Sequence, residues 1–209
     1  MKKKKAVLTA LIAVGLLTGC LGRGGNSVLN SESSRIFVTS EGTLQTSTIE
    51  SYDEQDYYNA EELKLYLEEA AAAYNEAASP GAVTLTSCTL EKGKAQMVFT
   101  YGSGRDLVGF VSEYEDRENQ VDSIDVTSLG LILGEIQSEG VVLVKASDNK
   151  AADEKTLLKR KEAYAIVVES PAPVTIQTQK RILFVSDQAV VKDSHTIETA
   201  QGKNYIIFK

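Results

Sequence analysis

Short runs of apolar and β-branched residues, separated by polar turns, occupy most of the chain after residue 35. The first two runs, Ile36–Thr39 and Thr43–Ile49, are joined by a segment that ends in Gly42, which predicts a β-hairpin with glycine in its turn. A second hairpin is predicted for Val83–Leu90 and Ala95–Tyr101, because the second of these runs alternates with the two-residue period of a strand.

Further strands are predicted mainly toward the C-terminus, where short apolar runs follow one another closely. Such spacing favours a small antiparallel sheet or a partial barrel. These predicted strands are Leu107–Val111, Val141–Val144, Tyr164–Glu169, Val174–Thr178, Arg181–Ser186, Ala189–Val191, Thr196–Thr199 and Asn204–Phe208.

The clearest helical pattern begins after Asn59, a favourable N-cap residue that Glu62 follows at the spacing of a capping box. Apolar residues then recur three and four positions apart, which predicts an amphipathic helix packed on a sheet rather than a partner-binding helix. Pro80 and Gly81 mark its end. The predicted apolar stripe contains Leu63, Tyr66, Leu67, Ala70, Tyr74 and Ala77.

Two other segments have helical patterns. Thr127–Glu139 suits a short helix interrupted by Gly130 and Gly134, and Asp153–Lys161 combines a capping aspartate with basic residues at its end. The charged segment Glu113–Asp125 is predicted to be an exposed connection. The pattern predicts an α+β fold of mainly antiparallel β-strands with one long amphipathic helix and one or two short helices.

The N-terminus has a different pattern, in which Lys2–Lys5 precede an apolar run that ends at Leu17. A basic segment followed by a short apolar one is typical of a secretory signal peptide, here residues 1–19. At about 1.5 Å of rise per residue, the run is too short to cross a hydrocarbon core of about 30 Å comfortably, so a retained transmembrane helix is the weaker alternative.

Leu17-Thr18-Gly19-Cys20 resembles the lipobox of bacterial lipoprotein precursors. The resemblance implies cleavage before Cys20, a diacylglyceryl thioether on its sulfur and often a third acyl chain on the new amine. Two or more chains anchor a protein stably in a bilayer, whereas one binds marginally. We therefore expect a lipid-anchored protein on the extracytoplasmic face of the cell membrane; the alternative is an ordinary signal peptide followed by an incidental cysteine.

Removal of residues 1–19 leaves 190 of the 209 residues, enough for one domain or two small ones. The removed segment holds four of the 22 basic residues and none of the 29 acidic ones, which leaves a net charge of −11. This charge argues against nucleic acid as a partner. Residues 20–34, rich in Gly, Ser and Asn, are predicted to form a flexible linker, and residues 35–209 an ectodomain with an alternative division into two lobes near residue 150.

Candidate catalytic residues are few. His195 is the only histidine, lies in a polar segment and is predicted to be an exposed or hydrogen-bonded loop residue. If Cys20 is lipidated, Cys88 has no disulfide partner, and its apolar surroundings predict a small core residue. The glycine-bearing turn Tyr101–Asp106 is predicted to connect two strands, because the glycine spacing and the following helix of a phosphate-binding loop are not evident.

Acidic and tyrosine side chains form two further groups. The acidic ones occur in polar segments without the spacing of an EF-hand, and solvated faces are favoured over weak calcium binding. The tyrosines around the predicted helix are assigned to core packing, with a sugar- or peptide-binding rim as the alternative. The acidic residues are Asp53, Glu54, Asp56, Glu113, Glu115, Asp116, Glu118, Asp122 and Asp125. The tyrosines are Tyr52, Tyr57, Tyr58, Tyr66 and Tyr74.

Glu50–Asn59 with its helix, and the closing segments Arg181–Ser186 and Tyr205–Lys209, are similar to parts of small uncharacterised surface lipoproteins of anaerobic Gram-positive bacteria. The resemblance implies an architecture and a location but no site. We expect a non-enzymatic binding or interaction module, without cofactor or metal, whose partner is an envelope protein or glycan. The alternatives are a solute-binding receptor of a transporter, with a cleft between two lobes, and a hydrolase of envelope polymers.

Overall fold

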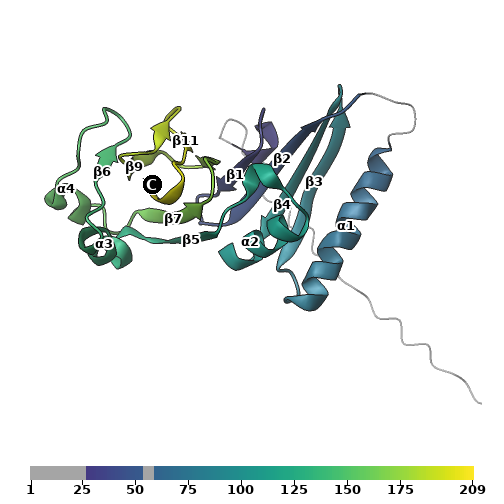
Figure 1. Ribbon diagram of the computed structural model, residues 1–209, viewed down its shortest axis with the longest axis horizontal. Helices are drawn as coiled ribbons and strands as arrows, with labels where there is room; N and C mark the ends of the chain where they lie inside the picture. Colours follow the sequence, from purple (N-terminus) through teal and green to yellow (C-terminus); the bar gives the residue numbers. More distant parts are fainter. Residues whose placement is uncertain (1–26, 54–58) are drawn as a thin grey trace, which may run out of the picture.

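The structure is a computed structural model, and it describes residues 27–53 and 59–209 (Figure 1). Two β-sheets share one large hydrophobic core, and helices cover the remaining apolar faces. Antiparallel pairs dominate both sheets. The predicted α+β class is confirmed.

The larger sheet has seven strands in the order β10-β11-β8-β1-β2-β4-β3. Its neighbours are antiparallel except for β1 and β8, which are parallel. Both predicted hairpins, β1–β2 and β3–β4, are confirmed, and Lys92 and Gly93 take the positive φ angles of a two-residue hairpin turn. The strands are β1 (Arg35–Val38), β2 (Leu44–Ser51), β3 (Val83–Glu91), β4 (Lys94–Tyr101), β8 (Thr175–Thr178), β10 (Val190–Val191) and β11 (Thr196–Glu198).

The smaller sheet has five antiparallel strands in the order β5-β7-β12-β9-β6. Both of its faces are buried, since Ile206 and Phe208 enter the shared core while Tyr205 and Ile207 enter a second core beneath helix α3. The strands are β5 (Ser123–Ser128), β6 (Leu143–Lys145), β7 (Tyr164–Ser170), β9 (Ile182–Ser186) and β12 (Gly202–Phe208).

The C-terminal strands are divided between the two sheets, so the prediction of a single small sheet or partial barrel was wrong. Strand β8 pairs with β1 of the first hairpin, whereas β7 pairs with β5 and β12. Each sheet therefore combines strands from before and after residue 150.

In the part of the chain that the structure describes, four α-helices and two short 3-10 helices complete the fold. They are α1 (Ala60–Ala77), α2 (Gly104–Glu113), α3 (Leu129–Ser138), α4 (Glu154–Leu158), η1 (Val28–Asn30) and η2 (Arg117–Asn119). Helices α3 and α4 lie at the opposite end of the molecule from α1 (Figure 1). The predicted N-caps of α1 and α4 are confirmed, because the Asn59 and Asp153 side chains accept hydrogen bonds from backbone N–H groups of the first turn.

The long helix α1 packs against β3 through a narrower stripe than predicted. Leu67, Ala70 and Ala71 are buried, but Tyr66 is 61% exposed. Only part of the predicted stripe therefore belongs to the core.

The predicted strand Leu107–Val111 is wrong, because these residues lie inside α2. The Ser103 hydroxyl accepts a hydrogen bond from the Asp106 N–H and caps the helix. Leu107, Phe110 and Val111 are buried, at the i, i+3, i+4 spacing of one helical face. The turn at Tyr101–Asp106 therefore connects a strand to a helix rather than to another strand.

Part of the predicted linker packs on the outer face of the seven-stranded sheet. Val28, only 4% exposed, forms a small cluster with Phe37 and Val98, and the Ser27 side chain caps η1. These contacts place η1 against the sheet within the segment predicted as a linker. The predicted signal peptide and Cys20 lie outside the described residues.

Among residues 27–53 and 59–209, no helix is both long enough and apolar enough to cross a membrane.

Candidate functional site

Helix α2 ends in a tight reversal that fixes two acidic residues above the seven-stranded sheet. The Asp116 N–H donates to the Val111 carbonyl at 3.0 Å and the Glu115 N–H to the Ser112 carbonyl at 3.4 Å, which is the bonding pattern of a Schellman motif. Glu115 occupies the left-handed position of the motif with φ +54°, where glycine is usual. A glutamate therefore stands at a strained position.

Asp116 joins a small polar cluster beneath this reversal. Its Oδ2 accepts hydrogen bonds from Thr48 Oγ1 at 2.6 Å and from Asn119 Nδ2 at 2.8 Å. The Asn119 amide also lies 3.1 Å from Thr48 Oγ1, and the whole residue is buried. These contacts tie η2 and the end of α2 to strand β2.

The cluster is short of hydrogen-bond donors. Within the described part of the chain, Asp116 Oδ1 and Asn119 Oδ1 are both buried and accept no hydrogen bond. A buried acceptor without a donor costs about 1–3 kcal/mol. Unpaired polar atoms of this kind need an explanation, such as a group that completes the site when it binds.

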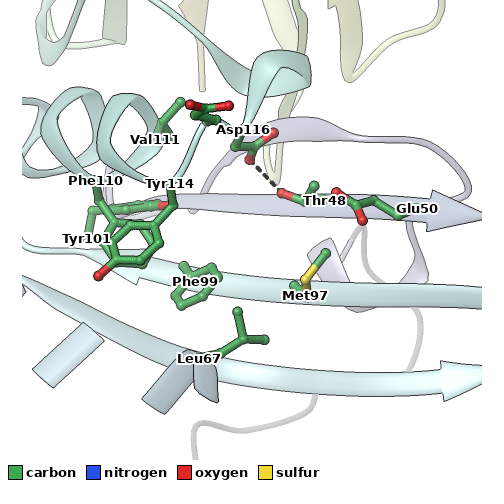
Figure 2. Close-up of a pocket in the computed structure, with 11 residues that line it drawn as sticks. Thr48, Glu50, Leu67, Met97, Phe99, Tyr101, Phe110, Val111, Tyr114 and Asp116 are labelled. Carbon is green, nitrogen blue, oxygen red and sulfur yellow. Dashed lines mark hydrogen bonds between the residues drawn. The ribbon is translucent and has the colours of Figure 1, made fainter. Parts of the chain in front are cut away.

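A pocket of about 100 Å³ opens beside this cluster, between α1, α2 and the sheet strands β2 and β4. In Figure 2, Asp116, Thr48 and Glu50 lie on one side, and Phe99, Tyr101, Phe110 and Tyr114 on the other. The pocket therefore has a polar side and an apolar side. Its lining residues are Thr48, Glu50, Leu67, Met97, Phe99, Tyr101, Phe110, Val111, Tyr114, Glu115 and Asp116.

The aromatic side of the pocket is built around Phe110. Its ring centroid lies 4.5 Å from that of Tyr114, 4.8 Å from Phe99 and 5.6 Å from Tyr74, in tilted and edge-on arrangements that favour aromatic packing. These contacts join α1, α2 and β4 into one wall.

Two tyrosine hydroxyls fix this wall further. The Tyr114 hydroxyl donates to the Ala70 carbonyl of α1 at 3.1 Å, and the Tyr101 hydroxyl is hydrogen-bonded to Thr46 Oγ1 at 2.9 Å. Burial raises the pKa of both hydroxyls, so they stay neutral near pH 7. They serve the frame of the pocket and add no charge to it.

The charged groups of the pocket are all acidic. Glu50, Glu115 and Asp116 line it, and its described lining contains no lysine or arginine. None of these carboxylates forms an ion pair with another described residue. Arg117 lines an adjoining hollow together with Glu115 and Asp116, but it forms no ion pair with either of them. The pocket thus combines an apolar wall with uncompensated negative charge.

Comparison with known proteins adds no identity to this geometry. No family model, curated protein or solved structure matches the chain. The site must therefore be interpreted from its own chemistry.

The predicted loop histidine is confirmed. His195 Nδ1 lies 3.2 Å from the Thr178 carbonyl and 3.1 Å from the Lys180 carbonyl, so this nitrogen carries the proton and donates. These bonds hold the 194–196 loop against the end of β8, in a place that does not line the pocket.

Cys88 lies half-buried on β3 and packs against the shared core, as predicted. Burial raises the pKa of its thiol, with Lys64 opposing this effect, so the thiol stays protonated near pH 7.

The predicted acidic group is only partly brought together. Glu115 and Asp116 meet at the pocket, Glu54 and Asp56 lie outside the described residues, and no group of three or more His, Cys, Asp or Glu side chains in the described segments could hold a metal ion. Weak calcium binding stays without support. Glu50 and Thr48 were missed because the β-branched pattern of β2 predicts a strand and indicates no site.

The tyrosine prediction is confirmed for Tyr74, whose ring packs edge-on against Phe110. It is wrong for Tyr66, which is largely exposed. Tyr57 and Tyr58 lie outside the described residues. The aromatic residues that line the pocket are Phe99, Tyr101, Phe110 and Tyr114, and none of them was predicted to form a site. The i, i+3, i+4, i+7 spacing of Leu107, Phe110, Val111 and Tyr114 was the signal that could have found Phe110 and Tyr114.

Proposed function

We propose that this protein is a lipid-anchored binding module on the extracytoplasmic face of the cell membrane, and that the pocket between α1 and α2 is its binding site. The anchor rests on the lipobox at Leu17–Cys20. The binding role rests on a rigid aromatic wall beside carboxylates that lack a cationic partner among the described residues.

The single observation that carries the binding role is the unsatisfied chemistry of the pocket. A protein gains stability when buried polar atoms are paired and apolar surface is covered. Here both conditions are left unmet at one place, where the pocket with its aromatic wall is lined by Asp116, whose Oδ1 accepts no hydrogen bond from a described residue. An arriving partner that supplies donors and apolar surface would meet both.

A solute-binding receptor of a transporter is the second candidate. A wider hollow of about 440 Å³ lies between residues 146–149, which follow a strand of the smaller sheet, and residues 189–191, which include β10 of the larger one. Its volume falls in the range of about 300–1,000 Å³ that small-molecule sites occupy. A soluble ligand that protected this hollow rather than the α1–α2 pocket would favour the receptor.

Site-specific photocrosslinking in intact native cells tests the proposal. A photoreactive amino acid replaces Glu115 at the pocket, and in a matched version it replaces Glu118, an exposed acidic residue that does not line the pocket. We expect one envelope partner to be captured from position 115 and not from 118. We also expect this capture to be lost when Cys20→Ala removes the anchor.

Equal capture from both positions, or capture unaffected by Cys20→Ala, would contradict the proposal. Turnover of an envelope polymer that Asp116→Asn abolishes would instead make the pocket a hydrolase site.

A further inference from the structure

We propose that the α1–α2 pocket binds the side chain of an arginine residue on a partner polypeptide. This inference rests on the proposed function and adds the chemistry of the group that is recognised. Three observations carry it: the size of the pocket, the sign of its charge, and the placement of aromatic rings beside unpaired acceptors.

The size of the pocket limits the group that fits. An engineered cavity of about 150 Å³ holds one benzene molecule, and sites for whole small-molecule ligands are usually about 300–1,000 Å³. A pocket of about 100 Å³ therefore accepts one side chain of a larger partner. Single anchor residues seated in such pockets, arginine among them, dominate the binding energy of many protein interfaces.

The charge of the pocket selects a cation. Three carboxylates line it, Glu50 and Glu115 exposed and Asp116 half-buried, and none is paired with a described basic residue, so the pocket attracts a cationic side chain and repels an anionic one. A cationic head placed between Glu50, Glu115 and Asp116 gains charge-assisted hydrogen bonds, which are roughly twice as strong as neutral ones.

The distribution of donors and rings favours arginine over lysine. A guanidinium carries five N–H donors in a fixed plane, is weakly hydrated and stacks on aromatic faces, whereas an ammonium is a strongly hydrated point charge. Phe110 and Tyr114 line the aromatic side of the pocket, while Asp116, whose Oδ1 accepts no hydrogen bond from a described residue, lines its polar side. The aliphatic stem of the arginine would cover Leu67, Met97 and Phe99.

The chain offers a direct probe of this pocket. It contains two methionines, Met1 and Met97, and Met97 lines the pocket. Cleavage before Cys20 removes Met1, so the lipidated chain, labelled with ¹³C at the methionine methyl group and kept in a non-ionic detergent, should give one methyl signal, that of Met97. Met97→Leu assigns the signal of the pocket by removing it.

The titration uses n-butylguanidinium and its uncharged isostere n-butylurea, followed by the peptides acetyl-Gly-Arg-Gly-amide and acetyl-Gly-citrulline-Gly-amide. We expect a saturable shift of the Met97 signal with both guanidinium probes and binding at least about tenfold weaker for the urea-headed ones. n-Butylamine, the lysine analogue, should bind less tightly than n-butylguanidinium.

Matched variants locate the effect. Asp116→Asn keeps the size of the side chain and an oxygen for Thr48 and Asn119, but it removes the charge, and it should weaken guanidinium binding at least about tenfold. Glu118→Gln removes an exposed charge outside the pocket and should leave binding unchanged. Both variants should retain the unliganded Met97 signal if the fold is intact.

The outcomes separate this inference from the proposed function. Equal binding of n-butylguanidinium and n-butylurea, or an Asp116→Asn variant that binds like the parent, would overturn the arginine assignment even if crosslinking from position 115 captures a partner. Binding of free n-butylguanidinium that exceeds binding of the arginine peptide would also overturn it, because the site would then serve a small cation. Failure of the crosslinking with intact arginine binding would instead count against the cellular role.

Discussion

Two groups of carboxylates in this protein have opposite surroundings. Glu135 of α3 and Glu139 at the C-cap of that helix share Lys203 of β12 as a cationic partner, and the Tyr205 hydroxyl lies 2.8 Å from an oxygen of each. At the α1–α2 pocket, Glu50, Glu115 and Asp116 have no such partner among the described residues. The first group is satisfied within the chain, whereas the second is left open.

The same difference extends to the packing around each group. The five-stranded sheet is covered on both faces, and Tyr205, Ile206, Ile207 and Phe208 of β12 are completely buried. On the helix-covered face of the seven-stranded sheet, the pocket leaves Met97 half-buried. One region is therefore built for stability, while the other keeps unmet interactions that suit binding.

Truncation of one side chain in each region should give the largest difference in unfolding free energy between the two regions. Ile207→Ala, in the closed region, is expected to cost about 2–5 kcal/mol of unfolding free energy because it leaves a cavity between β12 and α3. Met97→Ala should cost clearly less, because part of that side chain already borders open space. Urea unfolding of both variants gives the two values, and equal losses would contradict the distinction.

A second change acts on the contact between the two regions, where α2 begins against β5. A Cβ atom at Gly104 would lie 1.7 Å from the Ile124 carbonyl oxygen, so Gly104→Ala should destabilise the protein by at least about 1–3 kcal/mol. Gly134→Ala on α3 is the matched control, because no atom lies within 4 Å and alanine favours a helix by about 0.5–1 kcal/mol. Thermal unfolding should show a lower melting temperature for Gly104→Ala and a higher one for Gly134→Ala. A change of the same sign in both variants would be evidence against the close approach of Gly104 to the Ile124 carbonyl.

Two substitutions of Asp116, in the open region, separate the effect of its hydrogen bonds from the effect of its charge. Asp116→Ala leaves the Thr48 hydroxyl and the Asn119 amide without their acceptor, and should cost about 1–3 kcal/mol. Asp116→Asn preserves an acceptor oxygen, and its unfolding free energy should stay within about 1 kcal/mol of the parent. Chemical unfolding separates the two; an asparagine variant as unstable as the alanine variant would show that the charge itself holds this cluster together.

Glu115 tests whether the open region gives up stability for its charge. Glu115→Gly relieves the left-handed backbone and should stabilise the protein by about 1 kcal/mol while it weakens arginine binding. Lys92→Gly relieves a similar angle in the β3–β4 turn, which should bring stability without loss of binding. Unfolding and the Met97 titration together measure both effects. Unchanged guanidinium binding by Glu115→Gly would show that this glutamate does not contribute to the binding site.

Much of the fold could be predicted because its patterns are local. The hairpins at β1–β2 and β3–β4, and the N-cap at Asn59, depend on residues that are neighbours in sequence. The pairing of β8 with β1 depends on residues about 140 positions apart, and no local pattern specifies it. The division of the C-terminal strands between two sheets was missed for the same reason.

The candidate site was harder to predict because it is assembled from separate elements. Glu115 and Asp116 stood out only as members of an acidic segment, and Glu50 as part of a strand. Their meeting depends on α2, and the short apolar run Leu107–Val111 within it was predicted to be a strand. The N-cap at Ser103 and the helical spacing that continues to Tyr114 favoured the helix, and they would have placed the acidic reversal beside the sheet.

The smallest expected effect concerns the satisfied carboxylates. Hydrogen bonds from Lys203 and Tyr205 lower the pKa of Glu135 and of Glu139, so the folded state holds their charged forms more strongly than the unfolded state does. Their contribution to stability is therefore present above the unfolded pKa of about 4.3 and is lost as pH falls through the lowered folded values.

The melting temperature of the parent should exceed that of Lys203→Met at pH 6–7, and the difference should shrink toward pH 3. Because these side chains are exposed, the difference should be small and should decrease with added salt. A difference that stayed constant between pH 7 and pH 3 would show that Lys203 acts through its packing against Tyr205 rather than by satisfying the two carboxylates, and the contrast with the pocket would then lose its electrostatic basis.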